Sequence, residues 1–203
     1  MLNYVVRAVS LKTIKPLIET NHYSHSVNGL HWSYCFGLYD GDTLVGGMIY
    51  GTPAMRNAWR KYADKEEEII ELRRLACLDT LPQETIDSEG KRHSSSIESY
   101  FIAHTLRWLR KNTAIKKVIS YADAHHNHSG TIYRASNFKY LGQTPKGKLI
   151  LYAGKTYHDK TIRTRYKGKL KPYAQLIKNA LDNGEATIIN TAGKHIYLYT
   201  LRK

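Results

Sequence analysis

The sequence predicts an α/β protein in which helices flank a sheet, and three stretches lead to this expectation. Two apolar runs lie on either side of Asp40-Gly41, a dipeptide typical of a type I′ β-hairpin. A helix-capping pair, Ser95 and Glu98, precedes apolar residues at helical spacing. Residues 118–142 have the pattern of a buried strand, a polar loop, a short helix and another strand. With 203 residues and 42% hydrophobic content, the chain is long enough to bury one core.

The N-terminal half adds two further elements. A strand is expected at the start, followed by a helix that Ser10 caps and that Pro16 kinks or breaks. Residues 69–78 predict a strand in which Ile70, Leu72, Arg74 and Ala76 share one face. An arginine on a buried strand face is costly unless a carboxylate or a ligand pairs with it, so Arg74 is a candidate functional residue.

The charge is the strongest bulk signal. The chain has 31 Lys and Arg against 17 Asp and Glu, a net charge of +14, and such an excess indicates a polyanionic partner. We expect nucleic acid rather than a membrane, because no basic amphipathic helix with a wide apolar face is evident. The start of the chain lacks a signal peptide, so we expect a cytoplasmic protein. Cys35 and Cys77 are expected to be buried free thiols.

Two basic segments are candidates for DNA contact. The first holds Arg56, Arg60 and Lys61, although a solvated helix would explain it equally well. From residue 155 onward the composition becomes strongly basic, and alternating cations could line an extended arm against phosphates: Arg163, Arg165, Lys167 and Lys169.

The same change in composition suggests how the chain is organised. We expect residues 1–154 to form the core and residues 155–203 a basic extension packed on it, within a single domain. In the extension a helix should begin at Pro172 and end at Gly184. Two strands that form a pair should close the chain.

The candidate active site follows the strand at 118–121. Ligands of open α/β sheets bind beyond the carboxyl ends of the strands, and Asp123 lies at such an end. Tyr133 belongs to the short helix that follows, which Ser129 should cap and Asn137 should end in a left-handed conformation. A polar loop at residues 21–26 is a second candidate functional segment. Histidines of the two loops, His22 and His125, could bind a metal ion such as iron, although ten histidines on a basic chain have a simpler structural explanation.

Several motifs carry a resemblance to known families. The stretch SYAD…GTIYRASNFKYLG resembles the last helix and strand of the GNAT acyltransferases. Together with NHYS, ELRRL and a Ser-rich helix start, in that order over residues 4–151, it is similar to the Mom family of phage DNA-modification proteins. The resemblance implies a mixed, mostly antiparallel twisted sheet flanked by helices. It also implies an enzyme that carbamoylmethylates adenine N6 and so protects phage DNA from restriction.

The resemblance also implies roles for individual residues. A flipped adenine would meet Asp123 as a base, Tyr23 and Tyr133 as stacking or donating groups, and Arg74 as a partner of Asp123 or of a carbonyl. The usual glycine-rich pyrophosphate loop of the acyltransferases is absent, so an acetyl-CoA-like donor would be held at a helix start. The residues expected to hold it are Lys91, Arg92, Ser96 and Ser99. A homodimer is possible. An ordinary acetyl-CoA-dependent N-acetyltransferase and a non-catalytic nucleic-acid-binding protein on the same scaffold remain alternatives.

Overall fold

The computed structural model describes residues 4–55, 57–78, 96–126 and 128–202, and the backbone of two short strands at 85–86 and 92–93. The chain divides into two compact units, each described by itself below. Unit 1 comprises residues 1–122, 128–142 and 195–203, and unit 2 comprises residues 123–127 and 143–194.

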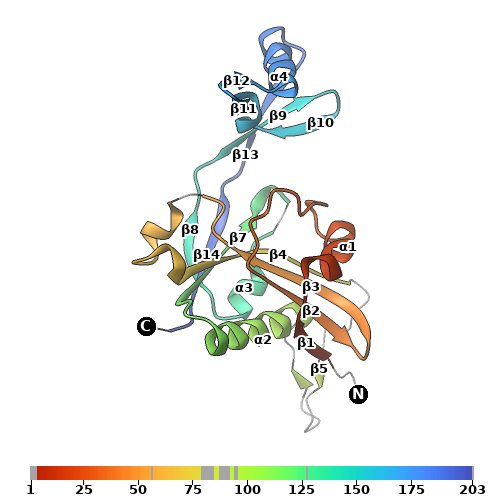
Figure 1. The fold of residues 1–203 in the computed structure, drawn as a ribbon, viewed down its shortest axis with the longest axis vertical. Helices are drawn as coiled ribbons and strands as arrows, with labels where there is room; N and C mark the ends of the chain where they lie inside the picture. Colours follow the sequence, from red (N-terminus) through yellow and green to blue (C-terminus); the bar gives the residue numbers. More distant parts are fainter. Residues whose placement is uncertain are drawn as a thin grey trace. The chain divides into compact units, whose positions relative to one another are not determined.

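Unit 1 is built on a seven-stranded sheet with the strand order β1-β2-β3-β4-β7-β14-β8 (Figure 1). Its first four strands are antiparallel neighbours, and β4 then pairs in parallel with β7. The mixed, mostly antiparallel sheet flanked by helices that the sequence predicts is therefore confirmed. The strands are β1 Tyr4–Ala8, β2 Tyr34–Asp40, β3 Thr43–Gly51, β4 Ile69–Cys77, β7 Lys117–Asp123, β8 Lys139–Gln143 and β14 Lys194–Thr200.

Helices cover both faces of this sheet. On one face, Ile14 and Ile18 of α1 (Leu11–Asn21) are fully buried with Cys35 and Ile49 in a small core. On the other face, α2 (Ile97–Asn112) and α3 (Thr131–Ala135) bury apolar and aromatic residues in the larger core (Figure 1). The remaining elements of unit 1 are short: η1 Ala58–Lys61, η2 Glu66–Glu68, β5 Thr85–Ile86 and β6 Arg92–His93.

Helix α1 confirms one expectation and corrects another. Ser10 is its N-cap, and the side chain accepts a hydrogen bond from the backbone N–H of Thr13. The helix continues through Pro16 as one element, so of the two expected outcomes, a kink or a break, the break is absent. The buried residues Ile14 and Ile18 lie on both sides of the proline, and their packing on the sheet holds the two halves of the helix together.

The β2–β3 hairpin forms where the sequence predicts it, but its turn lies one residue later. Asp40 pairs with Thr43, so Gly41 and Asp42 are the central residues. Of these two, only Gly41 has a positive φ, +58°, whereas a type I′ turn needs two such residues. The turn therefore has the pattern with glycine at the first central position, not the type I′ pattern that Asp40-Gly41 suggests.

Two helix ends near the candidate site also differ from expectation. The N-cap of α2 is Ser96, whose Oγ accepts a hydrogen bond from Ser99 N; Ser95 lies outside the described residues. The N-cap of α3 is Gly130 in the left-handed region, not Ser129. Asn137 does adopt the expected left-handed conformation after α3, with φ +62°.

A β-bulge in β4 overturns the predicted alternation of that strand. Ile49 pairs with Arg74 and Tyr50 with Leu72, so Arg73 is the extra residue. A bulge reverses the facing of the residues beyond it. Accordingly Leu72 packs in the core under α2, while Ala76 packs in the core under α1.

The last strand of the chain belongs to the central sheet of unit 1. The two closing strands, β13 and β14, do not pair with each other: β14 lies between β7 and β8, and β13 pairs with β9. The boundary expected after residue 154 thus falls inside unit 2, in the turn between β9 and β10. Most of unit 2 is an insertion between β8 and β14, because residues 143–194 lie between these two neighbouring strands in the chain.

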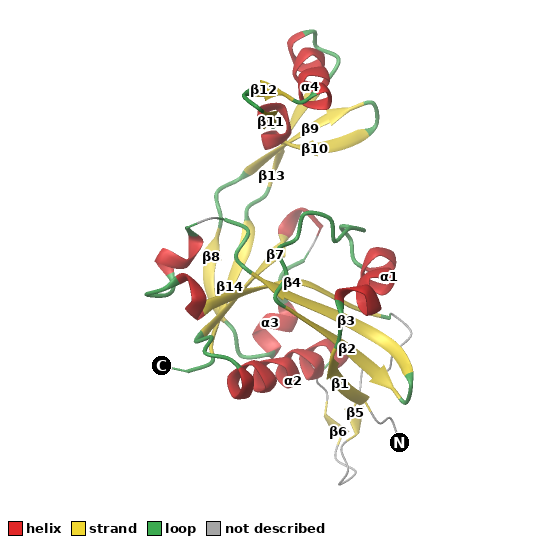
Figure 2. Cartoon of the chain, viewed as in Figure 1, coloured by secondary structure: helices red, strands yellow, loops and turns green. Residues whose placement is uncertain are grey.

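Unit 2 has its own small core. Its three-stranded antiparallel sheet has the order β10-β9-β13, and α4 packs on it through Ile150, Ile177 and Ala180 (Figure 2). As predicted, α4 begins at Pro172, and Gly184 follows its end with φ +76°. The elements of unit 2 are η3 Ala124–His126, β9 Gly147–Tyr152, β10 Lys155–His158, η4 Asp159–Arg163, β11 Arg165–Tyr166, β12 Lys169–Leu170, α4 Pro172–Asp182 and β13 Thr187–Thr191.

None of the helices within the described ranges has the length and apolar composition required to span a membrane.

Candidate functional site

In unit 1 the site begins where two parallel strands pair. The register of β4 and β7 runs from Ile69 opposite Lys117 to Leu72 opposite Ser120. At the last of these pairs, Ser120 is fully buried, and its Oγ donates a hydrogen bond to the Leu72 carbonyl at 3.2 Å. The Ser120 and Tyr133 hydroxyls are also hydrogen-bonded. Tyr133 of α3 is thereby fixed against the end of the strand pair.

Tyr133 is a buried hydrogen-bonding group. Its ring lies 5.3 Å from the ring of Tyr197 and 5.5 Å from that of Phe138, and the residue is 8% exposed. Burial raises the pKa of Tyr133 to about 12, and the hydrogen bond with Ser120 opposes part of this rise. The phenol is therefore neutral at pH 7, and because the Ser120 proton goes to the Leu72 carbonyl, Tyr133 donates its own proton to Ser120.

Tyr23 lies in the polar loop after α1 and is more open to solvent, with 37% exposure. Its ring is 4.3 Å from the His22 ring and 5.2 Å from the His128 ring. Tyr23 is also close enough to Arg74 and to Tyr133 to change the pKa of both groups. Three of the four predicted catalytic residues, Tyr23, Arg74 and Tyr133, therefore lie in one neighbourhood of unit 1.

Arg74 holds the polar loop to the sheet. Its Nε donates to the Ser26 carbonyl at 3.3 Å, and its Nη1 donates to the carbonyl of Arg73 at 2.7 Å. Burial lowers the pKa of Arg74, and the nearby Tyr23 partly offsets this effect. The recorded hydrogen bonds of Arg74 go to these two backbone oxygens, and its expected role toward a carbonyl of the substrate stays a prediction.

A buried acid that the sequence analysis did not single out lies on the same strand. Glu71 is 7% exposed, accepts a hydrogen bond from Ala54 N at 2.7 Å and lies 3.4 Å from Arg73 Nε. Arg73 also donates to the Thr52 carbonyl at 2.9 Å. The carboxylate thus compensates the arginine at the bulge, as a buried charge requires. In the sequence, the feature that could have indicated this ion pair is an acid two residues before an Arg-Arg pair in an apolar strand.

Asp123, at the end of β7, belongs to unit 2. Its carboxylate lies 2.9 Å from Lys194 Nζ and accepts a hydrogen bond from His125 N at 3.1 Å. Burial alone would raise the pKa of Asp123, but Lys194 and the His125 N–H together bring it below its ordinary value. The group is therefore ionised at neutral pH and is a weak base. Its contribution to stability is present above the ordinary carboxyl pKa and is lost as the pH falls through the lowered one.

The predicted metal ligands receive no support from the geometry. In the part of the chain that the structure describes, no group of three or more His, Cys, Asp or Glu side chains is placed to hold a metal ion. His22 Nδ1 accepts the backbone N–H of Ser24 at 3.1 Å and contacts its hydroxyl at 2.9 Å, so that nitrogen is used within the loop. His125 is exposed in η3, with its ring 5.4 Å from that of His126.

The residues expected to hold a cofactor lie at the start of α2. Ser96 caps the helix, and Ser99 is 5% exposed with its hydroxyl 3.2 Å from Ser96 Oγ, so both hydroxyls take part in the cap. Lys91 lies outside the described residues, and only the backbone of Arg92, in β6, is described. In the first turn of α2, Ser96 Oγ accepts the Ser99 N–H, whereas the N–H groups of Ile97 and Glu98 have no acceptor within the helix and point out of its N-terminus.

The predicted DNA-contacting residues fall in both units. In unit 1, Arg60 and Lys61 belong to η1 and Arg56 is not described; the Arg60 guanidinium lies 5.4 Å from the centre of the Trp59 ring. In unit 2, Arg163 forms an ion pair with Asp159 at 2.7 Å, whereas the other predicted cations belong to an exposed hairpin. These hairpin residues are Arg165, Lys167 and Lys169.

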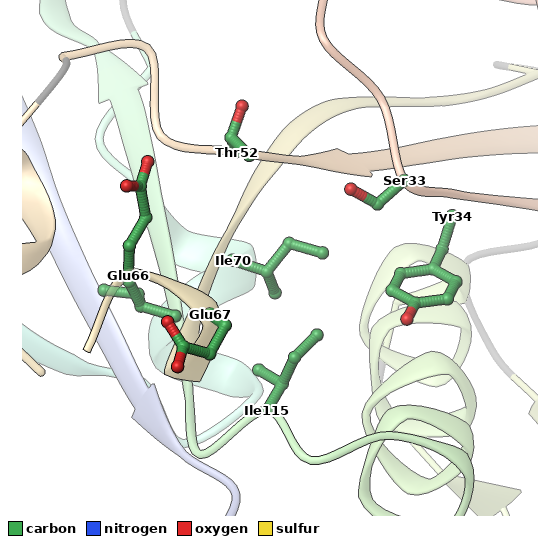
Figure 3. A pocket seen from close by; sticks show the side chains of 8 residues that line it. Ser33, Tyr34, Thr52, Glu66, Glu67, Ile70 and Ile115 are labelled. Carbon is green, nitrogen blue, oxygen red and sulfur yellow. The ribbon is translucent and has the colours of Figure 1, made fainter.

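A pocket of about 370 Å³ opens elsewhere in unit 1 (Figure 3). Ile70 and Ile115 form its apolar part, and Tyr34 lies on the side opposite Glu67. None of the predicted site residues lines it. Its complete lining is Ser33, Tyr34, Thr52, Glu66, Glu67, Ile69, Ile70 and Ile115.

Solved structures share this fold. A GNAT family acetyltransferase from Elizabethkingia anophelis with acetyl-CoA bound superimposes with a TM-score of 0.51 at 10% identity, over 98% of each chain. An acetyltransferase from Bacillus subtilis in complex with CoA gives a TM-score of 0.50 at 10% identity over the whole of both chains. At such low identity these likenesses show the fold alone, and the fold is that of the GNAT acyltransferases, as the resemblance implied.

Sequence comparison identifies the family. The methylcarbamoylase mom of Escherichia phage Mu is 25% identical over 166 residues, which cover 80% of this chain and 63% of the relative. The chain thus spans less than two thirds of that relative's length. The family model described as the Mom protein family matches residues 3–203, almost the entire chain. This chain therefore belongs to the Mom protein family.

Proposed function

We propose that the protein modifies DNA by transferring a carbamoylmethyl group to the exocyclic N6 of adenine. The observation that carries this proposal is the match of the Mom family model to residues 3–203. The name of the phage Mu relative, a methylcarbamoylase, gives the class of group transferred. The net charge of +14 supports a polyanionic substrate.

The neighbourhood of Tyr23 and Tyr133 suits a planar, hydrogen-bonding substrate. A base inside a duplex cannot enter an active-site pocket, so the target adenine must leave the stack. The half-exposed ring of Tyr23 offers a stacking surface, and the neutral hydroxyl of Tyr133 offers an oxygen that can accept a hydrogen bond. In this proposal Arg74 positions Tyr23 indirectly, because it fixes the loop through the Ser26 carbonyl.

Asp123 would orient the amine rather than remove its proton. The exocyclic amine is a poor nucleophile because its lone pair is delocalised into the ring. A carboxylate that accepts a hydrogen bond from the amine would align it for attack. The lowered pKa of Asp123 disfavours full proton transfer to this group, and Lys194 keeps it charged.

An acyl-CoA-type donor is the candidate cofactor, and α2 provides a partial fit for it. The N–H groups of Ile97 and Glu98 at the start of α2 would bind a phosphate, with Lys91 and Arg92 before them in the sequence. Glu98 in the first turn opposes an anion there. Ser96 and Ser99 would stabilise the conformation of the helix start, since their hydroxyls already form the hydrogen bonds of the N-cap. Attack of the amine on the thioester carbonyl would form an N-acyl bond and release the CoA thiol, so the CH₂–N bond and the amide nitrogen of a carbamoylmethyl group require a further nitrogen-containing co-reactant.

The proposal is tested by expressing the protein in a host, digesting the host DNA to nucleosides and weighing them. We expect a nucleoside heavier than deoxyadenosine by one carbamoylmethyl group. Unmodified DNA combined with acetyl-CoA turnover on small amines would indicate an ordinary N-acetyltransferase instead. Unmodified DNA combined with salt-sensitive DNA binding would indicate a non-catalytic nucleic-acid-binding protein.

A further inference from the structure

The hairpin formed by β11 and β12 is the most exposed basic feature of unit 2. Between Lys160 and Lys171 the sequence has six cations and no acid. Arg165 pairs with Leu170 and Tyr166 with Lys169, so Tyr166 and Lys169 lie directly opposite each other on the same face. The Lys167 ammonium lies 5.6 Å from the centre of the Tyr166 ring. At the tip of the hairpin an aromatic ring thus has one ammonium group over it and a second lysine directly opposite it on the neighbouring strand.

The hairpin is well braced for its size. Its turn residues, Lys167 and Gly168, both have positive φ, +48° and +80°, which is the pattern of a tight I′ turn. Arg165 Nη1 donates across the turn to the Gly168 carbonyl at 2.9 Å. Lys171 N donates to the Thr164 carbonyl at 2.9 Å and extends the ladder at the base.

The base of the hairpin is held by the core of unit 2. Ile162 of η4, just before β11, packs against the core under α4, and α4 itself begins directly after β12. The tip therefore projects from a fixed base and does not belong to a long loop.

Tyr166 stands out from the other large side chains of this unit. It is 66% exposed, the highest value among the large hydrophobic residues described, whereas Tyr173 of α4 is 46% exposed. Single exposed apolar residues are common on proteins and need no function. A ring held at the tip of a braced turn between lysines is a more specific arrangement. Its chemistry matches a nucleic acid, in which phosphates alternate with stacked bases.

We propose that the β11–β12 hairpin is a wedge whose lysines contact DNA phosphates while the Tyr166 ring enters the base stack. This rests on the proposed function in requiring double-stranded DNA as the partner. A side chain that enters between base pairs separates them and weakens the pairing of adjacent bases. The wedge would thus lower the cost of extruding an adenine, a step that chemistry on a base within a duplex requires.

The test uses the full chain and a duplex of mixed sequence that contains many A·T pairs. An extruded adenine leaves its thymine unpaired, and permanganate oxidises unstacked thymines, so no knowledge of the target sequence is needed. Four proteins are compared: the unchanged chain, Tyr166→Ala, Tyr166→Trp and the control Tyr173→Ala. Affinity for the same duplex is measured alongside.

We expect the unchanged chain to create reactive thymines and Tyr166→Ala to reduce their reactivity by at least about fivefold, as loss of a stacking contact implies. Tyr166→Trp should retain the reactivity, since a larger ring also stacks, and Tyr173→Ala should match the unchanged chain. Affinity should change by less than about threefold in all variants, because the phosphate contacts remain.

Three results would overturn the wedge: no reactive thymines with the unchanged chain, full reactivity with Tyr166→Ala, or an equal loss with Tyr173→Ala. The proposed function is judged separately by the nucleoside masses. If DNA is modified but Tyr166→Ala opens the duplex normally, the wedge alone fails. If duplex opening depends on Tyr166 while DNA stays unmodified, the wedge stands and the modification proposal fails.

Discussion

Units 1 and 2 place their polar residues in opposite ways. In unit 1, Glu71, Arg73, Ser120 and Tyr133 are largely buried, and each has a defined partner within the sheet or beside it. In unit 2, the core is apolar and small, while eleven Lys and Arg against four Asp and Glu make the unit strongly basic. Partnered, buried groups hold a fixed geometry, and exposed cations attract a mobile polyanion.

In the proposed function, this contrast corresponds to a division of labour, in which unit 1 would supply chemistry and unit 2 would bind DNA. Asp123 is the residue that fits this division least well. It ends β7, a strand of the central sheet, but it belongs to unit 2. Its partners, Lys194 and His125, are in unit 2 as well.

The largest effect is expected for Asp123→Ala. Loss of a group that orients the reacting amine should lower DNA modification by at least about 100-fold, the lower range for a positioned acid–base group. DNA affinity should stay within about twofold, since a single carboxylate near the surface adds little to phosphate binding. Modified nucleosides and duplex affinity are measured on the same protein. Asp182→Ala, at the exposed end of α4, is the matched control.

If Asp123→Ala abolishes modification, part of the chemistry depends on a unit 2 residue. The two units would then share the chemistry instead of dividing it from DNA binding. If modification persists, Asp123 has no part in the mechanism, and the neighbourhood of Tyr23 and Tyr133 must supply all of it.

The second prediction compares two glycines with the same backbone conformation. Gly130 in unit 1 has φ +75°, and a Cβ there would lie 2.2 Å from Cε2 of Tyr197. That ring cannot move aside easily, because Tyr197 is 1% exposed and its hydroxyl donates to the Ser129 carbonyl at 2.6 Å. Gly184 in unit 2 has φ +76°, with nothing within 4 Å of the Cβ position.

Gly130→Ala should therefore combine backbone strain with overpacking and cost about 3–5 kcal/mol of unfolding free energy. Gly184→Ala should cost only the strain of the left-handed conformation, about 1–2 kcal/mol. Denaturant unfolding gives the totals, and amide hydrogen exchange shows which unit loses protection. Equal losses for the two variants would mean that the packing around Gly130 is looser than the contacts of Tyr197 indicate.

The sequence predicted this architecture better than the partners of individual residues. Local signals were sufficient for the cap at Ser10, the left-handed Asn137 and the start of α4 at Pro172, because each depends on its immediate neighbours. The bulge at Arg73 was not predictable, since it is a property of the register between two strands. The placement of β14 between β7 and β8 was missed for the same reason.

The candidate site shows the same limit. Sequence analysis named Tyr23, Arg74 and Tyr133 as candidate catalytic residues, and the structure places them near one another. It gave no indication that Lys194, far along the chain, would be the partner of Asp123 in place of Arg74. Charge partners that come from distant segments depend on how the sheet is assembled, and a single sequence does not contain that information.

The smallest effect is expected within the basic segment of unit 2 itself, between Arg163 and Arg165. Arg163 donates to the Asp159 carboxylate at 2.7 Å, so its charge is already compensated, whereas Arg165 donates to the Gly168 carbonyl. Arg165→Ala should lower the slope of log affinity against log salt by about 0.9, the value for one phosphate contact on duplex DNA. Arg163→Ala should change the slope by clearly less, because binding a phosphate there competes with Asp159.

The slopes are obtained from duplex affinity measured at several salt concentrations. Lys15→Ala, in α1 of unit 1, is the control for loss of a positive charge. If Lys15→Ala changes the slope as much as Arg165→Ala, DNA binding is not a property of the unit 2 hairpin, and the contrast between the two units fails.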